Sequence, residues 1–370
     1  MASTLDRLRG RVVDAIDPRE HFLARARLAA HLAQIGEVNE AKSIAADLRR
    51  VNVASPNGLD GIQLVLLDGI SSYYNDLDGA CLDRISRALA LAQSINSRRL
   101  IGESAVWLAL VGYTFDKVNV LESALLAAVE HVDAIETSLH AKLCAVIADL
   151  LQLAGLMSEA GEWYSKARRL ARVDNNDAVL VAIEFNRLAA GLTRLKYDEI
   201  IEDNSAQSES RTWALEFESV DALHRVYQNK SLSNLLILCN ARRRYVSRDY
   251  NGTVPLLESL LADEAWGSVG LAEQTLRLEL LWCKLLRGDM SAIESYDFPS
   301  VEELATLNHG NRLDCVYYLS RICRCVAIAI DKDALESSLN GARSQLIAEI
   351  EVYRLLASKI VRRYSELNLG

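Results

Sequence analysis

Residues 140–176, HAKLCAVIADLLQLAGLMSEAGEWYSKARRLARVDNN, contain two apolar runs separated by Gly155. In the first run, apolar residues recur mainly at three- and four-residue spacings from Leu143 to Leu153, which predicts an apolar stripe along a helix. The second run restarts the stripe directly after Gly155 and continues to Ala171. Since only a few residues separate the two helices, we expect an antiparallel hairpin. A single hairpin cannot bury both apolar faces, so neighbouring hairpins must cover it.

The same hairpin pattern recurs along the chain. An opening helix is predicted at 3–16, followed by hairpins at 19–50, 62–94 and 100–135, and by further helical segments at 177–196, 219–229, 231–247, 271–286, 291–296 and 312–330. The predicted turns lie near 36, 75, 118, 155, 196, 249 and 288, a spacing of about 40 residues. Hydrophobic residues make up 50% of the chain, and it has only 4 Pro and 18 Gly, which favours long helices over strands and tight turns. The sequence therefore predicts an all-α chain in which 1–370 form one array.

Two segments depart from the repeat. Residues 202–213, EDNSAQSESRTW, are polar and serine-rich, which indicates a loop or a boundary between two halves of the array. Residues 333–370 are predicted to form a C-terminal helix whose apolar residues have nearly heptad spacing: Leu346, Ile350, Tyr353, Leu356, Ile360, Tyr364 and Leu367. This stripe either caps the last repeat, forms the seam of a homodimer, or leads into an output domain.

Two hairpins resemble the tetratricopeptide (TPR) repeat in their order of small, large, turn and aromatic residues. The matching sets are Ala148, Leu151, Gly155, Ala160, Tyr164 and Ala167, and Ala29, Leu32, Gly36, Ala41, Ala45 and Leu48. The resemblance implies a right-handed superhelical solenoid of antiparallel hairpins whose first helices line the concave face. The spacing of about 40 residues is similar to the elongated TPR-like repeats of bacterial regulatory proteins.

Composition narrows the class of partner and the location. The formal net charge of -9 argues against a surface built to hold nucleic acid. The N-terminus carries charges where a secretory signal would be apolar, and no uncharged run is long enough to span a membrane. The 7 cysteines form no CxxC pair and lie mostly in apolar helical stretches, so we expect them to be buried and reduced. A cytoplasmic protein is predicted.

No catalytic or metal-binding motif is present in the sequence. The 6 histidines are scattered singly, without an HExxH or GxSxG pattern, and no glycine-rich phosphate loop follows a strand. We therefore expect a non-enzyme that carries neither a metal nor a cofactor.

Polar residues on the predicted first helices are the candidates for contact with a partner. Arg242, Arg244 and Tyr245 lie in an arginine-rich stretch that is either an anion clamp or a solvated face. If it is a clamp, replacing Arg242 and Arg244 by Glu weakens binding of an acidic partner and leaves folding unchanged. The full candidate set is Arg27, Gln34, Asp149, Gln152, Asn186, Asn240, Arg242, Arg244 and Tyr245.

Two functions follow as hypotheses. The first is a scaffold that binds a protein or peptide on the concave face of the solenoid. The second is the sensory or regulatory region of a bacterial signalling protein, placed before an output domain such as a diguanylate cyclase or a transcription factor. The repeat pattern is specific for fold and does not distinguish between these functions.

Overall fold

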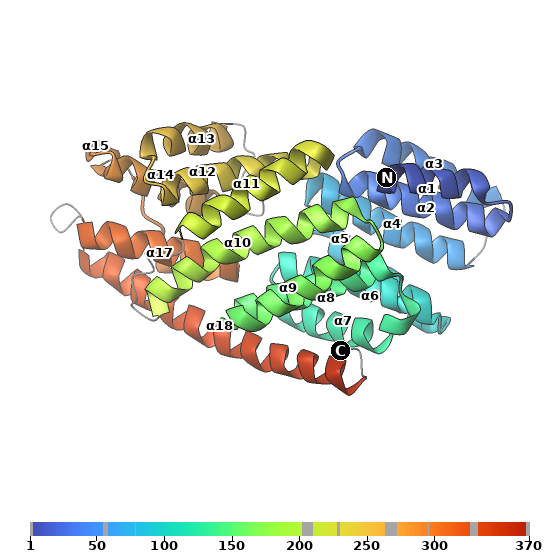
Figure 1. The fold of residues 1–370 in the computed structure, drawn as a ribbon. Helices are drawn as coiled ribbons and strands as arrows, with labels where there is room; N and C mark the ends of the chain where they lie inside the picture. Colours follow the sequence, from blue (N-terminus) through green and yellow to red (C-terminus); the bar gives the residue numbers. More distant parts are fainter. Residues whose placement is uncertain are drawn as a thin grey trace.

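A computed structural model of the chain describes residues 3–54, 58–77, 79–201, 210–227, 230–262, 272–294, 296–325 and 332–367. Within these ranges the chain forms eighteen α-helices and two short 3-10 helices, with no β-strand, which confirms the predicted all-α class (Figure 1). In chain order the elements are α1 Thr4–Asp14, α2 Pro18–Gln34, α3 Val38–Ala54, α4 Gly58–Asp76, α5 Ala80–Ser94, α6 Arg98–Thr114, α7 Val118–Glu130, η1 Val132–Ala134, α8 Thr137–Leu153, α9 Met157–Val173, α10 Asp177–Ile201, α11 Ser210–Tyr227, η2 Lys230–Leu232, α12 Ser233–Val246, α13 Tyr250–Ala262, α14 Glu273–Leu286, α15 Ser291–Glu294, α16 Val301–Thr306, α17 His309–Cys325 and α18 Lys332–Glu366.

The turns between successive helices share one backbone hydrogen bond. In the α8–α9 turn, the N–H of Leu156 donates to the carbonyl of Leu151 at 2.9 Å, and Gly155 adopts a φ of +73°. Gly36 takes the same left-handed conformation, with a φ of +84°. This is the bond pattern of a helix that ends in a left-handed residue. The same five-residue bond recurs at Glu37, Ser97, Lys117, Asn176, Asp249 and Asp289.

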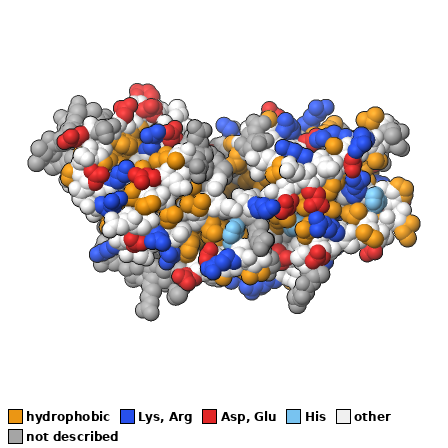
Figure 2. Space-filling view, turned by 90° about the horizontal axis from the view of Figure 1, so that it is seen from above, with side chains coloured by type: hydrophobic (Ala, Val, Ile, Leu, Met, Phe, Trp, Pro, Cys, Tyr) orange, Lys and Arg blue, Asp and Glu red, His pale blue; other side chains and the backbone are white. Residues whose placement is uncertain are grey.

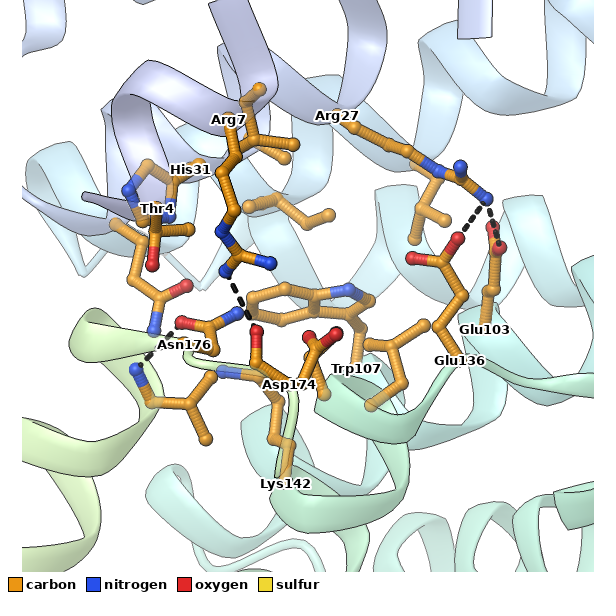
Figure 3. A pocket seen from close by; sticks show the side chains of 18 of the residues that line it. Thr4, Arg7, Arg27, His31, Glu103, Trp107, Glu136, Lys142, Asp174 and Asn176 are labelled. Carbon is orange, nitrogen blue, oxygen red and sulfur yellow. Dashed lines mark hydrogen bonds and ion pairs between the residues drawn. The ribbon is translucent and has the colours of Figure 1, made fainter. Parts of the chain in front are cut away.

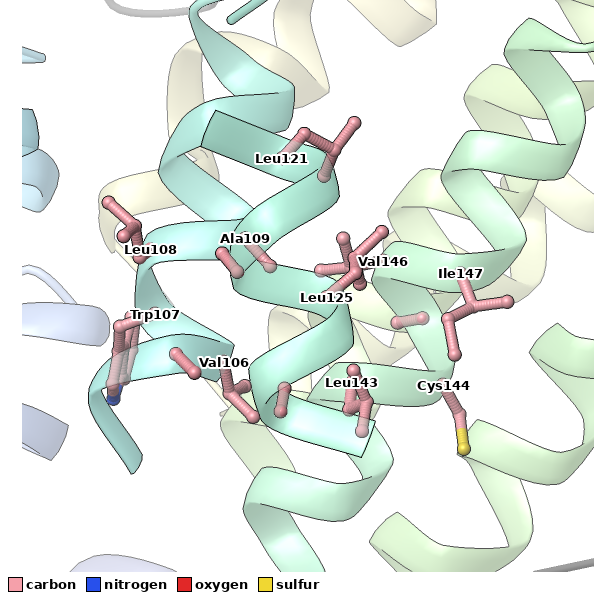
Figure 4. Packing of buried hydrophobic residues seen from close by; sticks show 14 of the residues in the cluster. Val106, Trp107, Leu108, Ala109, Leu121, Leu125, Leu143, Cys144, Val146 and Ile147 are labelled. Carbon is pink, nitrogen blue, oxygen red and sulfur yellow. The ribbon is translucent and has the colours of Figure 1, made fainter. Parts of the chain in front are cut away.

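Small residues let the paired helices approach, and large ones fill the space between them. Ala148 on α8 and Ala160 and Ala167 on α9 are buried, as are the neighbouring Leu151 and Tyr164. These side chains belong to the largest apolar cluster, which extends from α4 to α10 and includes part of α18 (Figure 4). Alanines at the helix contact leave little room for a larger side chain, so the packing of this hairpin depends on them.

The first helices of the hairpins are neighbours along an inner wall. Helix α2 packs on α4, α4 on α6, α6 on α8 and α8 on α10, while α3, α5, α7 and α9 pack as the second helices of their pairs. This neighbour order is consistent with the solenoid implied by the repeat pattern. The wall brings together side chains from helices that are far apart in the sequence.

The second half of the chain is less regular than the sequence predicts. The turn expected near residue 196 is absent, because α10 continues through Tyr197 to Ile201 without an intervening Gly or Pro. The helix expected at 291–296 shortens to the four residues of α15, and the unforeseen α16 follows it. Of the predicted break at 202–213, residues 202–209 lie outside the described residues, and the rest begin α11.

Helix α18 corrects the interpretation of the C-terminal stripe. It packs first on α16 and α17 and then runs back along α7 and α8, beside the middle of the chain (Figure 1). Arg354 donates to the carbonyl of Ala154 at 3.0 Å, and Tyr353 donates to Asp116. The stripe residues from Leu346 to Tyr364 are all buried by these contacts. These side chains are therefore not available as a dimer seam, because the chain covers them with its own helices.

Candidate functional site

Two sets of contacts close the inner wall of the N-terminal half into a hollow. Thr4 at the start of α1 donates its hydroxyl to the carbonyl of Asn175 at 2.8 Å, and the N–H of Asp177 donates back to that hydroxyl at 3.1 Å. The N–H of Lys230 in η2 donates to the carbonyl of Ile35 at 3.0 Å. These bonds join segments more than 160 residues apart, so the first helices surround a space rather than an open groove.

The smaller of two cavities in this hollow has a volume of about 120 Å³. Its wall comes from α1, α2, α4, α6 and α8 and from the segments around η1 and before α10. Figure 3 shows Arg7, Trp107 and Lys142 pointing toward the same space from three different helices. The polar and aromatic lining consists of Thr4, Arg7, Arg11, Arg27, His31, Gln34, Gln63, Glu103, Trp107, Glu136, Ser138, Lys142, Asp174 and Asn176.

Lys142 is a buried amine on the wall of this cavity. Its Nζ lies 4.2 Å from the centre of the Trp107 ring and 3.5 Å from the hydroxyl of Tyr74, and the residue is 7% exposed. Burial lowers the pKa of Lys142 to about 7. The face of an indole ring stabilises an ammonium group, so Trp107 favours the charged form of Lys142. A nearby anion would stabilise that charged form more strongly.

His31 is neutral at physiological pH, because it is buried near the positively charged groups of Arg7 and Lys142. Burial, with the positive charges of Arg7 and Lys142, lowers the pKa of His31 to about 4. At neutral pH its ring therefore offers one donor and one acceptor to the cavity.

Two of the three acidic side chains that line the cavity, those of Glu103 and Glu136, pair with arginines. Arg27 pairs with Glu136 at 2.6 Å and approaches Glu103 at 4.0 Å, and Arg99 also pairs with Glu103, at 2.8 Å. Arg7 instead donates to the backbone carbonyls of Asp174 and Asn175, each at 2.7 Å. Among the ion pairs of the described residues, none includes Arg7 or Lys142.

Three buried polar atoms around this cavity lack a hydrogen-bond partner within the described part of the chain. They are Nε2 of Gln34, Oε1 of Gln63 and Nε of Arg7. The two glutamines are 6% and 7% exposed, so bulk water reaches them poorly. Buried polar groups are usually satisfied, and leaving one unpaired costs about 1 to 3 kcal/mol. All three atoms belong to residues that line this one cavity.

The larger cavity, of about 240 Å³, adjoins the smaller one, because Lys142 and Val179 line both. Its wall is mainly apolar and aromatic, with contributions from α4, α6, α8 and α10. Asp149 lies there, and burial raises its pKa to about 7, although hydrogen bonds from Tyr164 and Asn186 lower it. The two cavities are therefore neighbours, one with a largely polar lining and the other with a largely apolar lining.

The structure brings together some of the predicted site residues. Arg27 and Gln34 line the smaller cavity, and Asp149 and Asn186 line the larger one. Gln152 is buried behind them, where it accepts a hydrogen bond from Tyr164 at 3.2 Å. The five residues lie on α2, α8 and α10.

The arginine-rich stretch is elsewhere, and neither of its two readings, an anion clamp or a solvated face, fits Arg242. Burial alone would lower the pKa of Arg242, but Glu279 and Asp314, each 2.8 Å away, raise it well above its usual value. The expectation that its reversal to Glu leaves folding unchanged is wrong for the same reason, because a third carboxylate would join two buried ones.

The other residues of that stretch also have partners. Arg244 pairs with Asp249 at 2.6 Å on the surface, and Asn240 accepts a hydrogen bond from Arg243 at 3.3 Å. The hydroxyl of Tyr245 accepts a hydrogen bond from Trp282 at 3.0 Å. The described side chains on the face in Figure 2 likewise mix acidic and basic groups rather than forming one patch of either sign.

Sequence reasoning missed the residues that converge on the smaller cavity: Arg7, His31, Gln63, Trp107 and Lys142. Each comes from a different helix, and only the contacts of α1 with the α9–α10 turn enclose them. One signal was available, since Lys142 is a charge within an otherwise apolar stretch. Such a residue is rarely buried without a reason.

No family model and no curated protein matches the chain. The described residues contain no cluster of three or more His, Cys, Asp or Glu side chains that could hold a metal ion. Among the described helices, none has the length and apolar character needed to cross a membrane.

Proposed function

We propose that this chain is a non-catalytic, TPR-like regulatory module that binds a small molecule in the smaller cavity. The observation that carries the proposal is the convergence of Gln34, Gln63 and Arg7, each with an unpaired buried polar atom, on one partly enclosed space. Concave, partly enclosed sites with a few directed polar groups are typical of ligand binding. The proposal corresponds to the sensory function expected from the elongated repeats.

Ligand binding at this position would stabilise the contacts that close the hollow. The cavity wall includes both α1 and the segment before α10, which are held together by Thr4, Arg7 and a small number of hydrogen bonds. A ligand that contacts both sides binds the closed arrangement better than an open one, and therefore shifts the population toward it. Helix α18 packs on both α8 and α17, so a movement of the helices around the hollow would be transmitted to the C-terminal half through packed helices.

The larger cavity supports a second candidate, the peptide-binding scaffold. Its apolar wall, with Tyr73, Tyr113 and Ile183, suits an apolar side chain of a partner segment, and Asp149 and Asn186 offer polar contacts beside it. We favour the small ligand because α1 and η2 cross the inner face and leave cavities rather than an open groove.

A cytoplasmic location is also part of this proposal. It is supported by five buried cysteines that form no disulfide: Cys81, Cys144, Cys239, Cys283 and Cys315.

A cavity-filling variant tests the proposal. Ala30 lines the smaller cavity, and Ala30→Leu adds volume there, whereas Ala46→Leu adds the same volume at an exposed position on α3. We expect protein purified from its native host to release a small molecule on denaturation, detected by mass spectrometry. Wild type and Ala46→Leu should release the same compound, and Ala30→Leu should release far less. Equal amounts from all three proteins, or none from wild type, would contradict the proposal.

A further inference from the structure

We propose that the smaller cavity selects a compact organic carboxylate, with its anionic group between Arg7 and Lys142 and its remaining polar atoms at Gln34 and Gln63. This inference rests on the small-ligand function proposed above and specifies the chemistry of the ligand.

The first argument is charge. Arg7 and Lys142 line the cavity, and neither has a carboxylate partner among the described residues. Arg7 is engaged only through backbone carbonyls, which leaves its Nε unpaired. Two cations close enough to His31 to lower its pKa together repel each other, and an anion between them removes that repulsion. The site is therefore complementary to negative charge.

The second argument is the amount of charge. Glu103, Glu136 and Asp174 line the same cavity, so its net positive charge is small. His31 adds no positive charge at neutral pH, because its pKa is about 4. A phosphate dianion would meet more repulsion from these carboxylates than a carboxylate monoanion would. The balance favours the singly charged group.

The third argument is hydrogen bonding and size. Nε2 of Gln34 needs an acceptor and Oε1 of Gln63 needs a donor, and both atoms are buried at the cavity. The indole of Trp107 supplies a flat apolar surface in the same cavity. A volume of about 120 Å³ limits the ligand to a compact molecule. A carboxylate with a short or planar body and one further polar atom fits these requirements.

Proton uptake should accompany binding. The titratable groups facing Lys142 across the cavity are Arg7 and Arg11 from α1, Arg27 and His31 from α2, Tyr74 from α4, Glu103 from α6, and Glu136 and Asp174 from the adjoining segments. Burial leaves most of the Lys142 amines unprotonated at pH 8, since their pKa is about 7. A bound carboxylate favours the ammonium form, so binding at pH 8 takes up nearly one proton.

Titration calorimetry of the full chain with acetate, lactate and benzoate tests the inference. The matched neutral compounds are acetamide, lactamide and benzamide, and inorganic phosphate is the competing anion. We expect at least one carboxylate to bind saturably and at least about tenfold more tightly than its amide and than phosphate. Titrations in buffers of different ionisation enthalpy at pH 8 should show proton uptake.

Variants locate the binding at this cavity. Gln34→Leu removes an unpaired buried amide, so it should fold at least as well as wild type and yet lose about tenfold or more in affinity. Lys142→Met should lose both the affinity and the proton uptake. Arg9→Met is the control, because Arg9 lies on the same helix as Arg7 but pairs with Glu40 on the surface. It should bind as wild type does.

Three results would overturn the inference: equal binding of a carboxylate and its amide, tighter binding of phosphate, or no binding of any carboxylate. If one of these occurs while wild type still releases a compound that Ala30→Leu does not, the carboxylate inference fails and the ligand-binding function stands. If no compound is released either, both fail.

Discussion

The N-terminal and C-terminal halves differ in how their buried charged side chains are paired. Around α12, α14 and α17, Arg242 lies between Glu279 and Asp314, and its bonds satisfy both carboxylates. Around the smaller cavity, Lys142 is also buried, but its contacts among the described residues are a ring face and a hydroxyl 3.5 Å away. The first arrangement pairs its charges within the chain, and the second includes no carboxylate partner for Lys142 in the described ranges. Burial of a charge therefore indicates binding only where its partners are missing.

The strongest test of this comparison removes Arg242. Arg242→Met leaves the fully buried Glu279 without its partner, and such a loss costs about 3 to 5 kcal/mol. We expect the midpoint of urea unfolding, followed by circular dichroism, to fall sharply.

Arg244→Met is the matched control, because Arg244 pairs with Asp249 at the surface and such pairs contribute about 0 to 1 kcal/mol. If both variants unfold at the wild-type midpoint, the buried network is not what holds the C-terminal half together.

A second, smaller effect is expected at the contact between α8 and α9. Ala160 is 2% exposed and faces the partner helix, so Ala160→Trp should overpack the hairpin and cost about 1 to 3 kcal/mol or more. The measurement is the thermal unfolding midpoint, with the exposed Gly161→Ala as a control, since a Cβ there meets open space. Wild-type stability of Ala160→Trp would show that the small-residue register of the repeat does not govern packing.

Local patterns carried most of the fold. Gly36 and Gly155 were identified as turn residues because a helix that ends in a left-handed residue favours glycine, and both adopt positive φ. Asn96, Asp116 and Asn175 make equivalent turns without glycine, which blurs the signal. The turn expected near 196 failed because no residue there forces the helix to end. Such boundaries depend on tertiary packing rather than on the local sequence.

The contacts between helices that are far apart in the chain could not be predicted from the sequence. The stripe on α18 has the spacing expected of a seam between helices, and its residues from Leu346 to Tyr364 are buried, but two of the covering helices, α7 and α8, are about 200 residues away. Likewise, Gln34 was predicted to face a partner, whereas Gln63 and Lys142 join it only because α1 reaches the α9–α10 turn. Periodicity shows which face is buried, and it does not show what buries it.

The pH dependence of stability distinguishes the two halves further. Lys142 has a pKa of about 7 in the folded chain and 10.5 as its ordinary value. Below pH 7 the amine is protonated in both the folded and the unfolded chain. Between pH 7 and 10.5 it is protonated mainly in the unfolded chain, so the free energy of unfolding rises with pH in this range. Lys142→Met should remove up to about 1.4 kcal/mol per pH unit from this rise between pH 7 and 9. Urea unfolding at pH 7, 8 and 9 measures it, and parallel profiles for wild type and variant would contradict the buried, unpaired amine.

The smallest expected effect concerns the closure that creates the cavity. Thr4→Val removes the hydroxyl that bonds both the carbonyl of Asn175 and the N–H of Asp177, while keeping the size of the side chain. A loss of about 1 kcal/mol is expected, concentrated in α1, because the rest of the fold does not depend on these bonds. Amide hydrogen exchange should therefore speed up in α1 and in the first turn of α10 and stay unchanged in α17. Thr306→Val is the control, since it removes a hydrogen bond at an exposed site on α16. If a ligand binds both sides of the cavity, it should restore much of the protection in Thr4→Val, because binding favours the closed arrangement. Faster exchange spread evenly over the chain would show instead that α1 is part of the general core, and the N-terminal ring would then be as complete without a ligand as the C-terminal half.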